Sequence, residues 1–548
     1  MSIFNKVRLR KPPRSTFDLS HEVKTTCDFG TLVPIMCEEV VPGDTFSLSS
    51  QLFCRVAPMV APIMSKVNVY THFFFVPYRL VWDHWEAFIT GGQDGKTFPE
   101  KPWATLSDVL DNQRLDIDTM DEEQRIGGLA DYLGLPIHLQ RGDSGSGQMI
   151  DLLPFFAYQK IWNDWYRDQN LQNEVVIPTD QQGEFAFSSL ERAQLLQIRQ
   201  RCWKKDYFTS ALPWPQRGED VHLPMEGKLP GLTVDNKLYN HNWERLPYSS
   251  GASVKVGKTS PSSSSQAGLI FDDQDGQQQI YLETKPQDVN FSSIAPTILE
   301  TRRAFKVQEW LERNAVGGSR YIEQILSHFG VRSSDARLQR PELLGGGKTP
   351  IIVSEVVQTS ETSGTPQGNM AGHGVSAQAT HRFKRYFEEH GLVIGIMSIM
   401  PITSYMQGIN KMWQRFDKFD YLWPEFANIG EQEIKNKEVA VGLTADDAYP
   451  EKVFGYTPRY SEYKYRNNRF GGEFRASMLN WHLGRVFGDD PILNSDFVTC
   501  NNTYRAGNTS TGELDRIFAY TKGHHFWVQV YHNLIAKRPL PYYGETHI

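Results

Sequence analysis

Strand-forming sequence stands near both ends of this chain, and helical or polar sequence fills the middle. The clearest strand is 66–76 (KVNVYTHFFFV), where alternate residues from Val67 to Phe75 share one face. The other face, from Asn68 to Val76, is polar early and apolar late. We therefore expect the end of this strand to be buried on both sides.

Two more strands are expected in the C-terminal half. The stretch 392–400 is apolar on both faces, as in a strand inside a sandwich, and 525–531 (HFWVQVY) lies close to the C-terminus. A single sandwich with strands from both ends and helices in its long loops accommodates this pattern. Jelly rolls are the commonest architecture of that kind.

Between the strands, helices are expected at 154–171, 301–315 and 320–329, from apolar residues at three-to-four spacing. The segment 219–300 contains low-complexity sequence (TSPSSSS) and short alternating pieces that suggest hairpins, so it is predicted to be an exposed insertion. The three glycines at 345–347 are expected to form a break.

Composition excludes several classes of protein. With 40% hydrophobic and 22% charged residues the chain is globular, and its five cysteines contain no CxxC pair, which fits a reducing cytoplasm and no zinc knuckle. No signal peptide is visible, and the longest apolar run, 391–401, is about half the length of a membrane helix.

No pattern of catalytic or metal-binding residues emerges. The sequence 345–349 (GGGKT) lacks the earlier glycine of a phosphate loop, with Glu342 in its place, and Pro350 follows, so a plain loop is favoured. The histidines are scattered, and the tripeptide 141–143 (RGD) is too short to carry an argument. We expect no catalytic residues, no metal and no cofactor.

Nucleic-acid contact is more credible at two places. The arm 1–20 is basic, although the whole chain has a net charge of −7, and it could lie on a phosphate backbone; the alternatives are a solvated tail or a clamp on a neighbouring subunit. The stretch 463–469 (YKYRNNR) interleaves aromatics with cations, with a surface edge strand as the alternative. The candidate residues are Lys6, Arg8, Arg10, Lys11, Arg14, Tyr463, Lys464, Tyr465, Arg466 and Arg469.

A dense aromatic stretch is a candidate subunit interface, because aromatic side chains are enriched in buried protein contacts. Packing within the chain's own core is an equal alternative. The residues are Trp413, Phe416, Phe419, Tyr421 and Trp423.

Several long blocks of this sequence resemble the major capsid protein of the Microviridae, in its gokushovirus branch. The first is 53–91 (FCRVAPMVAPIMSKVNVYTHFFFVPYRLVWDHWEAFITG). Others are 157–170 (AYQKIWNDWYRDQN), 308–341, 390–401, 416–432 (FDKFDYLWPEFANIGEQ) and 454–469 (FGYTPRYSEYKYRNNR). Together these blocks span most of the chain from about 20 to 540, and the poorly matching part is 219–300.

The resemblance implies a mainly β fold, an eight-stranded antiparallel jelly roll with long, partly helical inserted loops. It also implies a T=1 shell of 60 copies around circular single-stranded DNA, made in the bacterial cytoplasm, with no catalytic residues. In that branch a variable insertion forms protrusions near the threefold axes, and 219–300 is the candidate here for contact with a receptor on the host surface.

Charge suggests a further partner. Five basic residues in each of ~60 arms give about 300 positive charges, roughly a tenth of the phosphates in a genome of several thousand nucleotides. A small basic DNA-associated protein, polyamines or metal ions would supply the rest. Two rival functions remain open: a sugar-binding adhesin built on a β-sandwich, and an enzyme with a nonstandard site.

The expected organisation has six parts. They are the basic arm 1–20, the first jelly-roll strands 21–91, inserted loops and helices 92–218, the exposed insertion 219–300, a helical insertion 301–349 and the second set of strands 350–548.

Overall fold

The computed structural model of this chain describes residues 13–92, 96–110, 125–138, 143, 145–219, 221, 254–255, 268–271, 278–281, 298–318, 320–357, 370–500, 514–520 and 523–543. Contacts divide it into two units. One unit comprises Met1–Arg217 and Leu311–Ile548, and the other is Gly218–Trp310.

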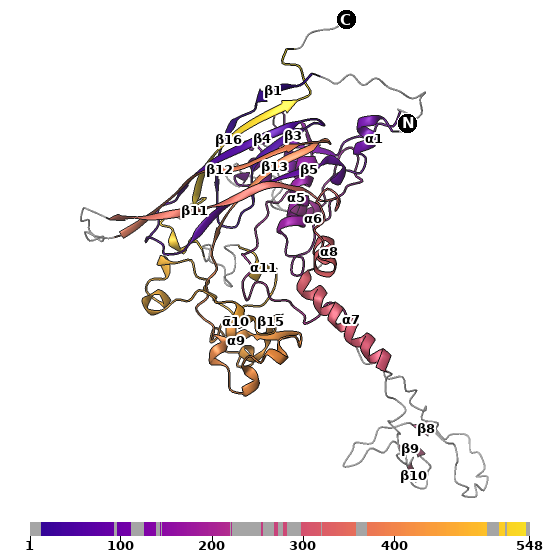
Figure 1. Cartoon of the computed structure of the whole chain (residues 1–548), viewed down its shortest axis with the longest axis vertical. Helices are drawn as coiled ribbons and strands as arrows, with labels where there is room; N and C mark the ends of the chain where they lie inside the picture. The colour runs from indigo at the N-terminus through magenta and orange to yellow at the C-terminus, as the bar shows by residue number, and fades with distance from the viewer. Residues whose placement is uncertain are drawn as a thin grey trace, which may run out of the picture. The chain divides into compact units, whose positions relative to one another are not determined.

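The larger unit is built on one strongly curled antiparallel sheet (Figure 1). The strand order is β1-β16-β4-β12-β11-β5-β13-β3, and β2 also pairs with β16. The strands are β1 (Ser15–Asp18), β2 (His21–Cys27), β3 (Val33–Val40), β4 (Thr45–Val56), β5 (Val67–Pro77), β11 (Glu342–Val357), β12 (Met370–Tyr386), β13 (Gly391–Pro401) and β16 (Phe526–Arg538).

This sheet confirms the mainly β, jelly-roll prediction, with strands drawn from both ends of the chain. In the part of the chain that the structure describes, the sheet holds nine strands. A turn in which the Ser20 backbone N–H donates to the Asp18 carboxylate (2.9 Å) separates β1 from β2. Each of the two then pairs with a different half of β16.

The strand predicted at 66–76 is β5, and its end is buried on both faces as expected. Phe73 and Phe75 face the interior of the curled sheet, where they contact Phe383 of β12 and Phe387 just after it. Phe74 faces outward onto a second apolar core formed with helix α5 (Leu153–Ile161). The fully buried strand β13 pairs along the whole length of β5.

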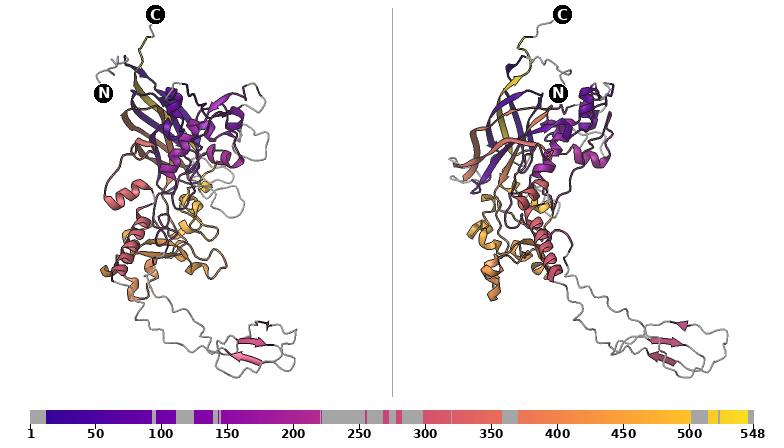
Figure 2. Two further views of the ribbon diagram at one scale, coloured as in Figure 1. Left: turned by 90° about the vertical axis from the view of Figure 1, so that its right-hand side faces the viewer. Right: turned by 45° about the vertical axis from the view of Figure 1, so that its right-hand side comes forward.

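Helices and loops cover the outer side of β5 and β13; in Figure 2 the purple elements of residues 85–195 lie against that part of the sheet. They include α1 (Trp85–Thr90), α2 (Leu106–Leu110), α4 (Leu129–Tyr132), α6 (Ser189–Leu195) and the small strands β6 (Trp103–Thr105) and β7 (Met149–Asp151). A π-helical turn (Trp162–Tyr166) follows α5, in the segment expected to be helical.

The predicted break at 345–347 is wrong: the three glycines lie inside β11, in the part that pairs with β5, and β12 pairs with the later residues 352–357. A Cβ atom on Gly346 would stand 2.5 Å from the Thr71 carbonyl oxygen, and one on Gly347 would meet the His381 ring. Glycine therefore permits close approach of neighbours in a strand, which composition alone does not reveal. The strand begins at Glu342, so 342–349 joins the sheet and not the preceding helices.

The predicted helix pair after residue 300 is present as α7 (Ile298–Gly317) and α8 (Tyr321–Phe329). The unit 218–310 contains a small antiparallel sheet of β8 (Val254–Lys255), β9 (Gly268–Phe271) and β10 (Gln278–Tyr281). A second small sheet, β14 (Glu431–Lys435) with β15 (Val453–Pro458), lies in the larger unit, with the short helices α9 (Asn436–Val439), α10 (Ser461–Lys464) and α11 (Ser495–Val498).

Candidate functional site: an aromatic and basic surface

The aromatic segment 413–423 is a loop held in shape by its own hydrogen bonds. It contains the 3-10 turns Lys411–Trp413 and Lys418–Asp420. The Asp420 carboxylate accepts from the backbone N–H groups of Phe416 (2.9 Å) and Asp417 (2.8 Å), and these bonds lower its pKa. The Trp423 indole N–H donates to the Lys418 carbonyl (2.8 Å). The loop is thus locally ordered, although none of its aromatic side chains is buried.

The five aromatic side chains of this segment face outward. Phe416 is 92% exposed and Trp413 70%, and the remaining three are about half exposed. Core packing within the chain, the alternative to an interface, is therefore wrong for these residues. Large exposed aromatic surface costs free energy in water, so a rigid loop that presents it is typical of a contact surface. The five residues are Trp413, Phe416, Phe419, Tyr421 and Trp423.

The aromatic segment is fixed to residues 460–463, forty positions later in the chain. Arg415 lies in an ion pair with Glu462 (3.4 Å) and over the Tyr463 ring (4.3 Å to its centroid), and both members of the pair are largely buried. The Tyr463 hydroxyl accepts from the Leu422 N–H (3.3 Å), and the Tyr460 hydroxyl donates to the Tyr421 carbonyl (3.2 Å). The two segments predicted for different roles therefore form one surface.

The segment 463–469 is not an edge strand. It begins in α10 and continues as irregular chain, so the alternative of a surface edge strand is wrong. Tyr463 packs on Arg415, and Lys464 lines a neighbouring cavity of about 370 Å3. Arg466 and Arg469 line a larger cavity, and Tyr465 lines both cavities.

This larger cavity has a volume of about 670 Å3, and its lining includes Trp413 and Arg466. Cations outnumber carboxylates in its lining, which includes Lys411, Arg466, Arg469 and Arg475 against Glu438 and Glu462. Sequence reasoning missed Lys411 and Arg475. The sequence 411–415 (KMWQR) carries the same interleaving of aromatic and cation as 463–469, and that signal could have found Lys411.

Glu438 is the more deeply buried of the two carboxylates that line the cavity. It accepts a hydrogen bond from the Tyr207 hydroxyl (3.1 Å) and lies 3.6 Å from the Lys411 ammonium. Burial raises the pKa of Glu438 above its ordinary value, and the cation partly opposes this. Its charge is engaged by Lys411, and the remaining cations of the lining leave the cavity with an excess of positive charge.

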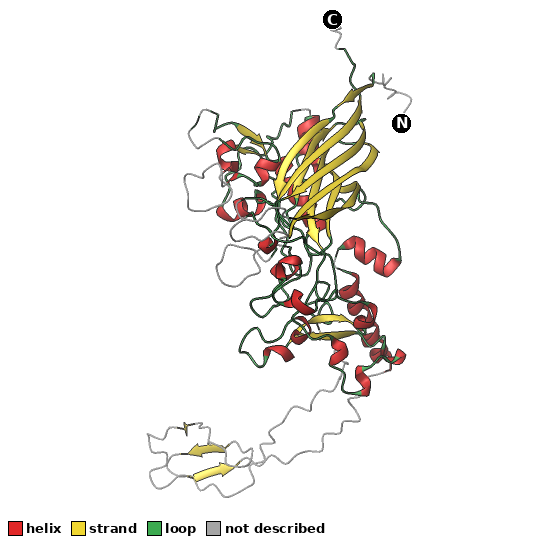
Figure 3. Ribbon diagram, turned by 90° about the vertical axis from the view of Figure 1, so that its left-hand side faces the viewer, coloured by secondary structure: helices red, strands yellow, loops and turns green. Residues whose placement is uncertain are grey.

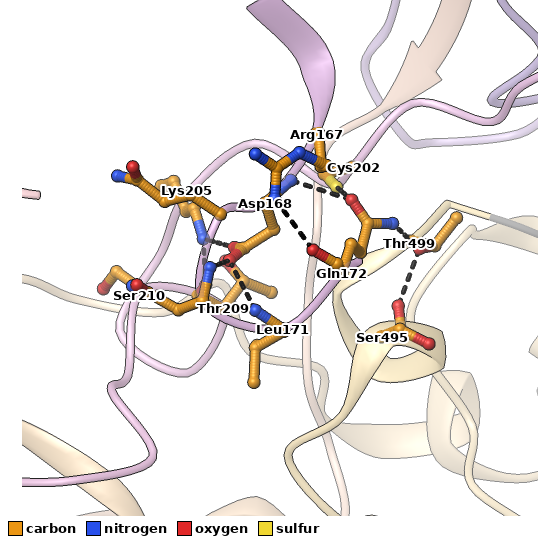
Figure 4. A network of polar contacts seen from close by, with 12 residues as sticks. Arg167, Asp168, Leu171, Gln172, Cys202, Lys205, Thr209, Ser210, Ser495 and Thr499 are labelled. Atoms are coloured by element: carbon orange, nitrogen blue, oxygen red, sulfur yellow. Dashed lines mark hydrogen bonds and ion pairs between the residues drawn. The ribbon is translucent and has the colours of Figure 1, made fainter. Parts of the chain in front are cut away.

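A polar network holds the segment that carries the cavity residues Tyr207 and Phe208 (Figure 4). Asp168 accepts from the Leu171 N–H (3.2 Å) and pairs with Lys205, and the Gln172 side chain donates to the Thr499 hydroxyl (2.9 Å). These bonds join the segments 167–172, 202–209 and 495–499, which are far apart in sequence. The second segment carries Tyr207 and Phe208, which line the cavity.

The basic arm falls mostly outside the described residues, which begin at Pro13, so Lys6, Arg8, Arg10 and Lys11 are not placed. Arg14 is exposed and lies 5.6 Å from the centroid of the Tyr386 ring. Among the residues that the structure describes, no group of three or more His, Cys, Asp or Glu side chains could hold a metal ion. Nor does any helix in that part have the length and apolarity to cross a membrane.

Comparison with known proteins gives a consistent result. The family model described as "Capsid protein (F protein)" matches residues 5–548. Capsid protein VP1 of Chlamydia phage 1 is 33% identical over 99% of this chain and 96% of its own length. VP1 of Bdellovibrio phage phiMH2K is 36% identical over 89% and 88%, and VP1 of Spiroplasma virus 4 is 29% identical over 97% and 95%.

Proposed function

Because this chain belongs to the F-protein family of phage capsid proteins, in its gokushovirus-type branch, we propose that 60 copies of it form a T=1 icosahedral shell. Membership of the family makes the chain a structural protein of a phage virion that assembles into a multimeric capsid. The copy number and the enclosure of a circular single-stranded DNA genome are our proposal. So is the absence of any enzymatic activity.

One observation carries the assembly proposal: the aromatic segment 413–423 is locally rigid and yet exposes all five of its aromatic side chains. A surface of this kind loses little conformational entropy on association and gains from burial of apolar area. A closed shell repeats each contact by symmetry, so a modest gain per contact is sufficient. We propose that Trp413, Phe416, Phe419, Tyr421 and Trp423 contact neighbouring subunits.

The enclosed genome would meet basic parts of the chain. The arm residues Lys6, Arg8, Arg10, Lys11 and Arg14 and the cavity residues Tyr465, Arg466 and Arg469 are candidates, together with Tyr463 and Lys464. The positive charge of the arm supports this proposal. Because the arms together carry far fewer charges than the genome has phosphates, we also propose a small basic partner protein. Deletion of residues 1–14 should weaken assembly or DNA ordering without abolishing packaging. Intact shells of the deletion variant that contain no DNA would refute the proposal of a basic partner.

We further propose that residues 219–300 contact a receptor on the bacterial surface. Their polar composition supports this, as does the separation of 218–310 into a contact unit of its own. Synthesis in the host cytoplasm is the remaining proposal; all five cysteines are free thiols, which is compatible with a reducing compartment.

Expression of the chain alone, followed by sedimentation and negative-stain electron microscopy, tests the function. Closed shells, or symmetric pentamers that become shells when phage factors are added, are the expected result. A monomer or trimer that persists with single-stranded DNA and the other phage proteins would contradict it and favour a sugar-binding adhesin, whose exposed aromatics would bind carbohydrate.

A further inference from the structure

The sheet formed by β16, β4, β12 and β2 has an outer face that carries an ordered set of exposed aromatic and polar side chains. Along β16 burial alternates strictly, so that Phe526, Val528 and Val530 face the core. Trp527 and Tyr531 point outward and are 42% and 43% exposed. The neighbouring strand β4 alternates in the same way and directs Phe53 outward. Figure 3 shows a broad face of the sheet with no helix across it.

The three outward aromatics form a regular series across two strands. Phe53 stands opposite Gln529, and Gln529 lies midway between Trp527 and Tyr531. Phe53 is therefore diagonal to both, at a spacing of roughly 7–8 Å in an antiparallel pair. That is about twice the 3.4 Å rise per nucleotide along one strand of B-DNA. The spacing fits an extended strand whose bases stack on side chains and not on each other.

The charge of this outer sheet face opposes that of the chain as a whole. Arg55 is opposite Trp527, Lys24 is opposite Gln529, and Lys537 lies further along β16. Arg382 and Lys384 extend the series on β12. The acidic residues at the described outward positions are Asp18 and Glu22, and Glu22 is engaged by Lys24 (3.6 Å) and by Gln529. On these strands five cations thus stand against two acids, on a chain with a net charge of −7. Glu38 and Asp131 also line the hollow beside Phe53 and Trp527, and even with them the cations are in excess.

We propose that this outer sheet face binds single-stranded nucleic acid without sequence preference, with bases stacked on Trp527, Phe53 and Tyr531 and phosphates beside Arg55, Lys24 and Lys537. The inference rests on the proposed packaging of single-stranded DNA and names a surface for it. Every base has a face that can stack on an aromatic ring, so such a series tolerates any sequence. The Arg55 guanidinium lies 5.4 Å from the Phe53 ring centroid, so it can contact both that ring and a phosphate of the bound strand.

A second copy of the chain is the competing occupant. The composition of the face opposes it, because Gln529 lies between Trp527 and Tyr531, Gln51 stands opposite Tyr531, and Arg55 lies over the Phe53 ring. The excess of positive charge would also repel an identical face.

Photocrosslinking locates the contact. The full chain would be mixed with an oligo(dT) 20-mer that carries 5-iodouracil, irradiated, digested and analysed by mass spectrometry. The proposal predicts crosslinks in peptides that contain Phe53, Trp527 or Tyr531. Crosslinks confined to 1–14 or to 463–469, or none at all, would overturn it.

Affinity for the same oligonucleotide gives an independent readout. The double change Trp527→Ala and Tyr531→Ala should lower it at least tenfold, since stacking on each ring is removed. Trp527→Phe, which keeps a ring, should retain most of the affinity. Asn533→Ala changes a residue without a ring on the same outward face and should leave the affinity unchanged. Arg55→Gln should reduce the slope of log affinity against log salt by about 0.7. Equal affinity of the double variant and the parent would contradict the proposal.

The outcome is separable from that of the proposed function. Shells that sediment normally and contain DNA, with no crosslink on this face, would leave the capsid function intact and remove only this inference. Protection of Trp527 from hydroxyl radicals in shells assembled without DNA would assign the face to a second copy instead.

Discussion

The guanidinium carbon of Arg415 lies 4.3 Å from the ring centroid of Tyr463, so that residues forty-eight positions apart hold two loops in one surface. The same guanidinium pairs with Glu462, and the Glu462 carboxylate also accepts from the Gln432 amide (2.6 Å). The shape of the aromatic segment therefore depends on a largely buried ion pair.

Arg415→Met should lower the free energy of unfolding by about 2 kcal/mol, because it leaves the Glu462 carboxylate buried without its cation. Denaturant unfolding of the unassembled chain measures this. Arg415→Lys should lose less, since it keeps the charge. The double variant with Glu462→Gln should recover part of the loss, and strictly additive effects would show that the pair is not coupled.

Phe416→Ser should leave the stability of the unassembled chain unchanged, because this side chain is 92% exposed. If Phe416 is buried between subunits, the concentration needed for assembly should rise roughly tenfold, as for loss of about 1.4 kcal/mol per contact. Light scattering, recorded as a function of protein concentration, measures the concentration at which assembly begins. Phe98, which is 71% exposed and outside the aromatic segment, provides the control: Phe98→Ser should assemble normally.

Gly346→Ala should destabilise the sheet by about 2 kcal/mol, because the added Cβ would stand 2.5 Å from a backbone oxygen of β5 that cannot move aside cheaply. Thermal unfolding provides the comparison. Gly488→Ala is the matched control, since nothing lies within 4 Å of the position of its Cβ. If the two variants had the same melting temperature, the packing argument for the triglycine segment would be wrong.

The pair of His525 and Asp28 should make stability depend on pH. The His525 ring and the Asp28 carboxylate lie 2.7 Å apart. Burial opposes the charge on each group, but the hydrogen bond and charge of Asp28 raise the pKa of His525. The hydrogen bonds and charge of His525 likewise lower the pKa of Asp28. The histidine's contribution is complete below its ordinary pKa of 6.5 and is lost as pH rises through the raised value. The aspartate's contribution is present above 3.8 and is lost as pH falls.

Melting temperature measured from pH 4 to pH 9 checks this dependence. The parent should lose stability as the pH rises above 6.5, through the raised pKa of His525, and His525→Gln should flatten that part of the curve. An identical fall in the variant would assign the pH dependence to other groups.

Much of the sheet could be predicted because the pattern of apolar residues along each strand indicates which of its faces is buried. The alternation in β5 and the continuous apolar run of β13 reflect one or two buried faces, and both strands lie where expected. The glycines of β11 led to a wrong prediction of a break. Glycine is needed there because Thr71 and His381 approach closely, and that contact depends on the tertiary structure. The outer sheet face was missed because Trp527 and Tyr531 alternate with equally apolar valines, so composition does not tell the two faces apart.

The candidate site was predictable in its parts but not in its arrangement. The density of aromatics marked 413–423, and the alternation of aromatics with cations marked 463–469. That the two meet at one cavity depends on the fold between them. The role of Arg415, which joins them, follows from the burial of its ion pair and has no local signal.

Hydroxyl-radical footprinting of Trp413 and Phe416, in assembled shells and in the unassembled chain, tests the central claim most directly. Oxidation of an exposed ring reports its contact with solvent, so burial between subunits should lower the rate for both residues several-fold on assembly. Phe98 should be oxidised at the same rate in both states. Equal rates for Trp413 and Phe416 in shells and in the free chain would contradict the claim that the aromatic segment joins the subunits.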